Sequence, residues 1–239
     1  SGGGFVKPVV MKERIQRQFQ DFWDRGRVLF LSAPCGFGKT TLARALLAGK
    51  QVLALTPDGP DFSLPPQLED WETLLLDDAQ LMQEDQWQAL CALIRTSPQR
   101  RFVLLSRGTP PGCLMVFRYA GLMTVLEPDD LLFGREDIRR LFQQQGVAIT
   151  DSEISGILKE SIGYPLGVVI TARNMAGGTP FGPDIVSQSF REVFVYFEMA
   201  IYRRFDLPIR RFLLEMALFD TFDLEMARVV SGDPHTVEL

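Results

Sequence analysis

The sequence predicts an α/β fold, with a parallel sheet flanked by helices first and helices alone afterwards. Up to about residue 126, short apolar runs alternate with amphipathic stretches of helical period. This order is typical of parallel sheets, because each crossover between neighbouring strands needs a helix or a long connection. After about residue 127, the strand-like runs give way to successive amphipathic helices. The chain is therefore expected to contain a sheet domain followed by helical domains.

The expected elements of the sheet domain alternate along the chain. A helix is expected at residues 11–24, where Ile15, Phe19 and Phe22 recur at helical spacing before Gly26 breaks the pattern. Four apolar runs are the expected strands, at residues 28–31, 52–55, 74–76 and 102–105. Further helices are expected at residues 40–48 and around an apolar face formed by Trp87, Leu90, Cys91 and Ile94. Polar residues follow the strands, so the carboxyl edge of the sheet is the expected place for chemistry.

The second part of the chain carries several helix signals. A helix at residues 135–145 is expected to end at Gly146, and Thr150 with Glu153 forms a capping box that opens the next one. A joint rich in glycine and proline is expected at residues 175–184. Three more helices are expected at residues 189–204, 207–218 and 224–230, the middle one with Asp206 as N-cap and Pro208 in its first turn.

Composition excludes several classes of protein. The 239 residues carry a formal net charge of -5, which argues against a standing nucleic-acid surface. No apolar run approaches the roughly 18 to 20 residues that cross a membrane, and no signal peptide is recognisable, so a cytoplasmic location is expected. Cys35, Cys91 and Cys113 form no CxxC pair, so neither a disulfide framework nor a zinc site is expected. Residues 1–4 look like a flexible lead-in.

The stretch LSAPCGFGKTTLAR, residues 31–44, predicts a phosphate-binding loop. A glycine-rich turn between a strand and a helix points backbone N–H groups and the helix N-terminus at one place, where phosphate charge is stabilised. Lys39 supplies a cation for the outer phosphates, the Thr40 hydroxyl suits Mg²⁺, and Thr41 suits a further phosphate contact. The candidate nucleotide-binding residues are Ala33, Pro34, Cys35, Gly36, Phe37, Gly38, Lys39, Thr40 and Thr41.

Ala33 stands where the GxxxxGK pattern has its first glycine, which fits only if its φ is negative. An ordinary tight turn is the alternative to a phosphate-binding loop. Cys35 is interpreted as a spacer that contributes its N–H, rather than as a redox switch.

Two further motifs complete the candidate site. In LLLDDAQ, Asp77 can reach magnesium and Asp78 can orient the attacking water; the alternative is a pair of turn-forming aspartates that cap the next helix. Because aspartate is one methylene shorter than glutamate, Asp78 is expected to support only slow hydrolysis. In FVLLSRG, Arg107 follows a strand at the ligand-binding edge and can sense the γ-phosphate, unless it is a surface arginine in a turn. The predicted catalytic residues are thus Lys39, Asp78 and Arg107.

The segment SIGYPLG breaks a helical region at Gly163 and Pro165. The Pro165 ring could lie against a nucleotide base, although the segment alone predicts only a helix break.

Taken together, five segments resemble successive landmarks of the MalT-like branch of STAND signal-transduction ATPases, often found in LuxR-type transcription regulators. They are APCGFGKTTLA, LLLDDAQLM, FVLLSRGTPP, GYPLG and LPIRRFLLEMALFDTF, and the resemblance extends from about residue 5 to residue 232. It implies a P-loop NTPase domain at residues 5–126, a helical lid at 127–180 and an α-helical winged-helix-type domain at 181–239.

The resemblance also implies roles for individual residues. Lys39 and Thr40 would form the phosphate and magnesium site, Asp77 the second magnesium anchor and Arg107 the sensor. Gly163 and Pro165 match the lid motif that touches nucleotide. The interval between Thr40 and Asp77 is shorter than in the family, so the trimming of a helix is expected there, with the trimming of a strand as well left open. His235 is interpreted as an exposed loop residue and receives no role.

In the family, ADP holds a closed monomer, whereas ATP with an inducer opens it toward self-assembly. The expected partners are therefore ATP or ADP with Mg²⁺, a small-molecule or protein inducer, and further copies of the chain. DNA would be bound by an effector domain outside this chain, so we expect a fragment that itself contacts neither nucleic acid nor membrane. An AAA-type motor or clamp loader and a nucleotide-binding scaffold without hydrolysis stay open as alternatives.

Overall fold

The computed structural model describes residues 9–65, 71–217, 223, 225–226 and 229. The chain divides into two units, the first ending at Val186 and the second beginning at Ser187. Within the described residues, no helix combines the length and the apolar character that a bilayer span requires.

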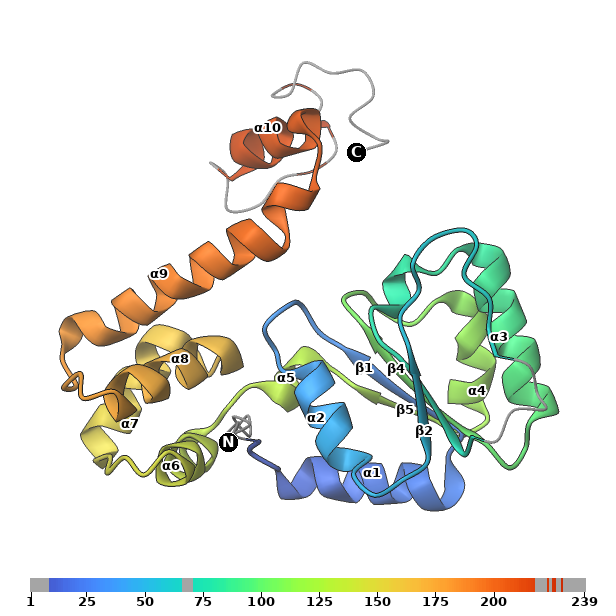
Figure 1. Cartoon of the computed structure of the whole chain (residues 1–239), viewed down its shortest axis with the longest axis horizontal. Coiled ribbons are helices and arrows are strands. Elements are labelled where there is room, and N and C mark those ends of the chain that lie inside the picture. Colours follow the sequence, from blue (N-terminus) through green and yellow to red (C-terminus); the bar gives the residue numbers. More distant parts are fainter. Residues whose placement is uncertain (1–8, 66–70, 218–222, 224, 227–228, 230–239) are drawn as a thin grey trace, which may run out of the picture. The chain divides into compact units, whose positions relative to one another are not determined.

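Five parallel strands form one sheet in the order β2-β3-β4-β1-β5 (Figure 1). The strands are β1 (Val28–Ser32), β2 (Val52–Leu55), β3 (Thr73–Leu76), β4 (Arg101–Ser106) and β5 (Met123–Leu126). The four expected strands are present with ends within one residue of the prediction. The sequence did not reveal β5, because its four residues include Thr124 and two of its side chains are only half-buried. The α/β class is confirmed.

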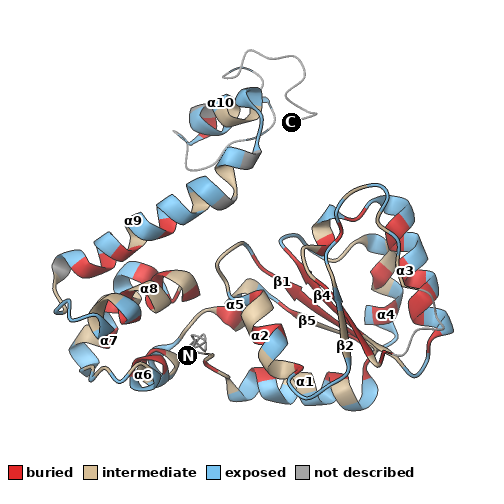
Figure 2. Cartoon of the chain, viewed as in Figure 1, coloured by how far each residue is buried: buried red, intermediate tan, exposed pale blue. Residues whose placement is uncertain are grey.

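Helices cover both faces of the sheet, which explains why its strands are apolar throughout. The helices of the sheet domain are α1 (Glu13–Arg25), α2 (Lys39–Leu46), α3 (Glu84–Thr96), α4 (Met115–Tyr119) and α5 (Pro128–Leu131). Phe30 and Leu104 point to the face that packs against α3 and α4. Their neighbours Leu29 and Leu105 point to the opposite face, against α1 and α2. Figure 2 shows the buried residues concentrated along the strands.

Three helices follow the sheet domain within the first unit: α6 (Arg135–Gln144), α7 (Asp151–Ser161) and α8 (Pro165–Ala176). Gly146 adopts a left-handed φ of 70° just after α6, as expected for a glycine that ends a helix. The predicted capping box is confirmed, since the Thr150 hydroxyl accepts a hydrogen bond from the Glu153 N–H. The break expected in SIGYPLG is also present, because α7 ends at Ser161 and α8 begins at Pro165.

Two further helices follow: α9 (Pro183–Ala200), which extends into the second unit, and α10 (Leu207–Met216). The helix expected at residues 189–204 begins six residues earlier, at a proline, which is favourable in a first helical turn. It ends at Ala200, and a short 3-10 turn η3 (Tyr202–Arg204) follows. Of the helix expected at residues 224–230, the structure describes only residues 225–226 and 229, which are helical, and the histidine at position 235 lies outside the described residues. The bounds of the three expected domains and the winged-helix assignment stay predictions.

Candidate functional site

The loop after β1 has the backbone conformation of a phosphate cradle. Its first residue, Ala33, donates its N–H to the Ser106 carbonyl at 3.1 Å, which ties the loop to β4. Gly36 and Gly38 have left-handed φ values of 82° and 78°, and Gly38 is the N-cap of α2. When residues with left-handed φ alternate with residues of negative φ, successive backbone N–H groups point to one place. The non-glycine residues with positive φ in the described chain do not include Ala33, so an alanine fits there as expected.

Lys39, the first residue of α2, is buried inside this loop. Its Nζ donates hydrogen bonds to the carbonyls of Ala33 at 2.6 Å and Pro34 at 3.0 Å. Burial is the largest cause of a lowered pKa at Lys39, and Arg107 lowers it further, whereas Cys35 and the two aspartates oppose the shift. The ammonium therefore lies where an added polyanion would favour its charged form.

Thr40 and Asp77 bring two oxygen ligands together. The Thr40 hydroxyl donates to Asp77 Oδ2 at 2.9 Å, although the two residues lie 37 positions apart in the chain. Hard oxygen donors of this kind suit Mg²⁺, which keeps several waters and takes one or two protein ligands beside phosphate oxygens. No group of three or more His, Cys, Asp or Glu among the described residues could hold a metal by itself. The donor set fits magnesium held jointly by Thr40, Asp77 and a phosphate.

Asp78 lies next to this pair in an uncommon backbone conformation, with a φ of 54°. Its Oδ1 lies 3.3 Å from the Arg107 guanidinium and accepts a hydrogen bond from Gln80 Nε2 at 2.8 Å. Arg107 reaches Asp78 because β4 lies between β1 and β3 in the sheet. The side chain of Asp78 makes no capping hydrogen bond to the following turn, and α3 is capped by Gln83. The alternative of helix-capping aspartates therefore gains no support.

The segment between α7 and α8 contacts the loop directly. The Tyr164 hydroxyl donates to the Cys35 carbonyl at 2.9 Å, and the Leu166 N–H donates to the Gly36 carbonyl at 3.1 Å. The Tyr164 ring also packs edge-on against Phe37, with 5.3 Å between ring centroids. Gly163 and Pro165 flank these contacts, and Pro165 is buried as the first residue of α8. The lid motif predicted to touch nucleotide thus lies against the phosphate-binding loop.

The structure brings together most of the predicted site. Lys39, Thr40, Asp77, Asp78 and Arg107 lie around one end of the sheet, and Thr41 is half-buried one residue further along α2. The cationic side chains make this edge of the sheet able to bind a polyphosphate, and the carboxylates make it able to hold a water.

Sequence reasoning missed two contact residues, Gln80 and Tyr164. Both stand inside quoted motifs, Gln80 two positions after Asp78 and Tyr164 between the lid glycine and proline. Their position inside these motifs was the only signal in the sequence. Gln80 contacts a residue 27 positions away, and Tyr164 contacts a residue 129 positions away.

No protein-family model and no curated protein matches this sequence. Solved structures do match it. A Walker-type ATPase of Pyrococcus abyssi has a TM-score of 0.61 at 15% identity, covering 92% of this chain and 83% of its own. A variant of RuvB from Thermotoga maritima has a TM-score of 0.57 at 18% identity, covering 98% and 88%.

A third match is to a STAND protein with a tetratricopeptide-repeat sensor from Pyrococcus horikoshii. Its TM-score is 0.53 at 13% identity, and the match covers 100% of this chain but 41% of that protein. At these identities the likeness concerns the fold. The chain has the fold of P-loop ATPases, as the sequence predicts.

Proposed function

We propose that this chain is an ATP- and ADP-binding switch module with slow ATP hydrolysis, which controls the self-assembly of a larger transcriptional regulator. The observation that carries the proposal is the Thr40 to Asp77 hydrogen bond of 2.9 Å, next to a buried Lys39 in a loop with two left-handed glycines. This arrangement supports phosphate and magnesium binding at one place.

The chain's residues would divide the work of hydrolysis. Lys39 and the loop N–H groups would stabilise the phosphate charge, and Thr40 with Asp77 would hold magnesium. The metal, when bound, would neutralise charge that develops on the phosphate oxygens. Asp78 would orient the attacking water, and Arg107 would leave Asp78 to bind the γ-phosphate. Because Asp78 is already paired with Arg107 at 3.3 Å, each turnover would need this pair to separate, which favours slow hydrolysis.

The regulatory part of the proposal rests on the sequence resemblance to MalT-like STAND ATPases and on the fold shared with a STAND protein. By that resemblance, ADP would hold a monomer and ATP with an inducer would favour self-assembly. Sedimentation of the full chain in Mg-ADP and in Mg-ATP tests this part, with and without an extract that supplies the inducer. A monomer under all conditions would contradict it.

Nucleotide binding is tested by thermal unfolding. A ligand at 100 times its dissociation constant stabilises the folded state by about 2.7 kcal/mol, which corresponds to a rise in melting temperature of about 5–10 °C for a domain of this size. We expect this shift with Mg-ADP or Mg-ATP in the wild type and in Lys159→Ala, an exposed lysine on α7. Lys39→Ala should abolish it. Wild-type protein that neither retains nor responds to nucleotide would refute the proposal.

Turnover separates the proposed switch from the alternatives. A switch should hydrolyse ATP well below about one per second, whereas a motor would exceed that rate. Asp78→Asn should remove the residual activity and keep nucleotide binding. A wild type that binds Mg-ATP and never hydrolyses it would indicate a scaffold.

A further inference from the structure

Gln80 connects the two groups to which the hydrolytic roles are assigned. It belongs to the 3-10 turn η1 (Ala79–Leu81), which follows β3 and the two aspartates. Its amide nitrogen donates to Asp78 Oδ1 at 2.8 Å, and its amide oxygen accepts the backbone N–H of Arg107 at 3.0 Å. One side chain therefore joins the carboxylate after β3 to the loop after β4.

We propose that Gln80 is a positioning residue that holds the Asp78 carboxylate in place for water and anchors the backbone of Arg107. This inference rests on the proposed function, because it concerns hydrolysis at the same site. It assigns to Gln80 a role that neither the motif spacing nor the fold indicates.

The chemistry of the amide fits both contacts at once. A glutamine carries a donor and an acceptor on the same group, so it can serve a carboxylate and an N–H together. Glutamate at this position would keep the acceptor for Arg107 but place a second carboxylate against Asp78. Alanine would supply neither contact.

The backbone of Asp78 needs such support. A left-handed φ is unfavourable for a residue with a Cβ and persists only where the surroundings fix it. Asp78 donates its own N–H to Asp77 Oδ1 at 3.0 Å, and its carbonyl accepts the Leu81 N–H at 3.0 Å. Gln80 adds a hydrogen bond to the Asp78 side chain, whose position these two bonds do not fix.

The contacts also explain how Arg107 can leave without disturbing Asp78. Gln80 and Arg107 both approach Oδ1, so the Gln80 bond remains when the guanidinium moves to a phosphate. Oδ2 would then accept the proton of the attacking water. The water oxygen bonds to the γ-phosphorus as the bond from that phosphorus to the bridging oxygen of ADP breaks.

The test compares Gln80→Ala and Gln80→Glu with Gln88→Ala, an exposed glutamine on α3. We expect kcat to fall about 10- to 100-fold in Gln80→Ala, because a hydrogen bond to a charged group is lost. The dissociation constants of Mg-ATP and Mg-ADP should stay within about twofold of wild type. Gln88→Ala should match wild type in every respect.

A further readout separates positioning from general support of the fold. In nucleotide-free protein, the Arg107 amide should exchange with solvent faster in Gln80→Ala but not in Gln80→Glu, which keeps the acceptor for this N–H.

The outcomes distinguish this inference from the proposed function. If the wild type hydrolyses ATP and Gln80→Ala keeps the wild-type kcat, the inference about Gln80 is overturned and the proposed function is not. A Gln80→Ala variant whose affinity and melting temperature fall along with kcat overturns it as well, because a structural role would suffice. An Arg107 amide that exchanges equally fast in wild type and Gln80→Ala also overturns it. Wild-type protein that binds Mg-ATP without hydrolysing it overturns both this inference and the hydrolytic part of the proposed function.

Discussion

At the residue scale, the polar groups of the candidate site are hydrogen-bonded within the protein. The Lys39 ammonium is satisfied by two carbonyls of its own loop, and the Thr40 hydroxyl by Asp77. Such pairing keeps buried polar atoms satisfied and keeps each side chain near the place where a phosphate or a metal would need it. On binding, a ligand would replace these hydrogen-bond partners of Lys39 and Thr40 with a phosphate and a metal.

Replacing Thr40 with valine tests the magnesium role. The two side chains have similar shapes, but valine lacks the hydroxyl that donates to Asp77 at 2.9 Å. We expect the affinity for Mg-ADP to fall about tenfold, the loss of roughly one good metal contact. The affinity measured in excess chelator should equal that of wild type. Equal losses with and without magnesium would show that the hydroxyl acts on the fold or the phosphate instead.

Sequence reasoning at this scale succeeds where the partners are local. The strand, glycine loop, Lys39 and Thr40 lie within one short stretch, so their spacing predicts a common site. Gln80 was not predicted, because nothing near it in the sequence indicates that the loop after β4 lies within hydrogen-bond distance.

At the element scale, the turn before α8 meets the loop before α2 at close range. A Cβ added to Gly36 would lie 1.8 Å from the Tyr164 hydroxyl, which no side chain tolerates. A Cβ added to Gly38 would meet nothing within 4 Å. Both glycines have a similar left-handed φ. The two positions therefore separate backbone strain from the contact between lid and loop.

We expect Gly38→Ala to lower the free energy of unfolding by about 1–2 kcal/mol, the cost of a left-handed alanine. Gly36→Ala should cost about 1–3 kcal/mol more, because the Tyr164 ring must move. Combining Gly36→Ala with Tyr164→Ala should recover part of that extra loss relative to the sum of the single variants. Denaturant unfolding without nucleotide is measured for the wild type, the three single variants and the double variant. Equal costs at both glycines would mean that Tyr164 does not press on the loop.

The capping box of α7 offers a separate test of the stability of the predicted lid. Thr150 donates two hydrogen bonds to the Glu153 carboxylate, from its hydroxyl and its N–H, each at 2.7 Å. The hydroxyl bond, then the backbone bond, lowers the pKa of Glu153. A depressed pKa means that this stabilisation is complete above the unfolded value of 4.5 and is lost as the pH falls through the folded value.

Thr150→Ala should therefore lower stability by about 1 kcal/mol at pH 7. The difference from wild type should shrink as the pH falls below the unfolded pKa of 4.5 and Glu153 becomes protonated in both proteins. Ser152→Ala, an exposed position in the same turn, should change stability by less than about 0.5 kcal/mol. A Thr150→Ala effect that is independent of pH would show that the carboxylate contributes nothing.

At the scale of the whole molecule, the class of fold was predictable and the strand order was not. Apolar runs of three or four residues identified the strands, but the order of the strands depends on contacts between distant segments. The insertion of β4 between β1 and β3 is what places Arg107 beside Asp78. The expected trimming between Thr40 and Asp77 agrees with the described residues, in which β2 leads to β3 without a helix.

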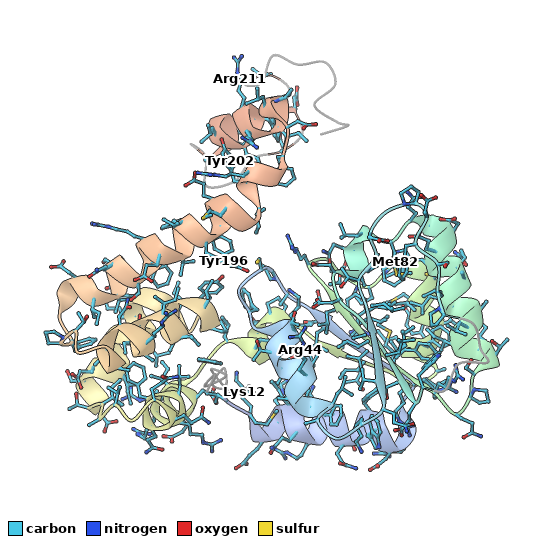
Figure 3. All side chains as sticks on the ribbon, in the orientation of Figure 1. Lys12, Arg44, Met82, Tyr196, Tyr202 and Arg211 are labelled. Carbon is cyan, nitrogen blue, oxygen red and sulfur yellow. The ribbon has the colours of Figure 1, made fainter. Side chains whose placement is uncertain are left out.

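Lys12 connects the start of the sheet domain to the helices that follow it within the first unit. Labelled in Figure 3, it is the N-cap of α1, and its Nζ donates to the carbonyls of Asp130, at 2.9 Å, and of Leu132. The Asp137 carboxylate of α6 lies 3.6 Å away. One ammonium group thus bridges α1, the end of α5 and α6, where the chain passes from the sheet to the predicted lid.

Lys12→Met should release this connection while it keeps the length of the side chain. If nucleotide is enclosed between loop and lid, a looser lid will open more often, so the dissociation rate of a fluorescent ADP should rise about 5- to 10-fold in stopped-flow measurements. The association rate should change less. Arg25→Met, on the same helix but paired with Asp21 one turn away, is the matched control and should leave both rates unchanged. Lys12 belongs to neither the phosphate-binding loop nor the lid motif. Faster release would therefore show that nucleotide retention depends on the Lys12 contacts with α5 and α6, and an unchanged rate would show that it depends on the direct contacts alone.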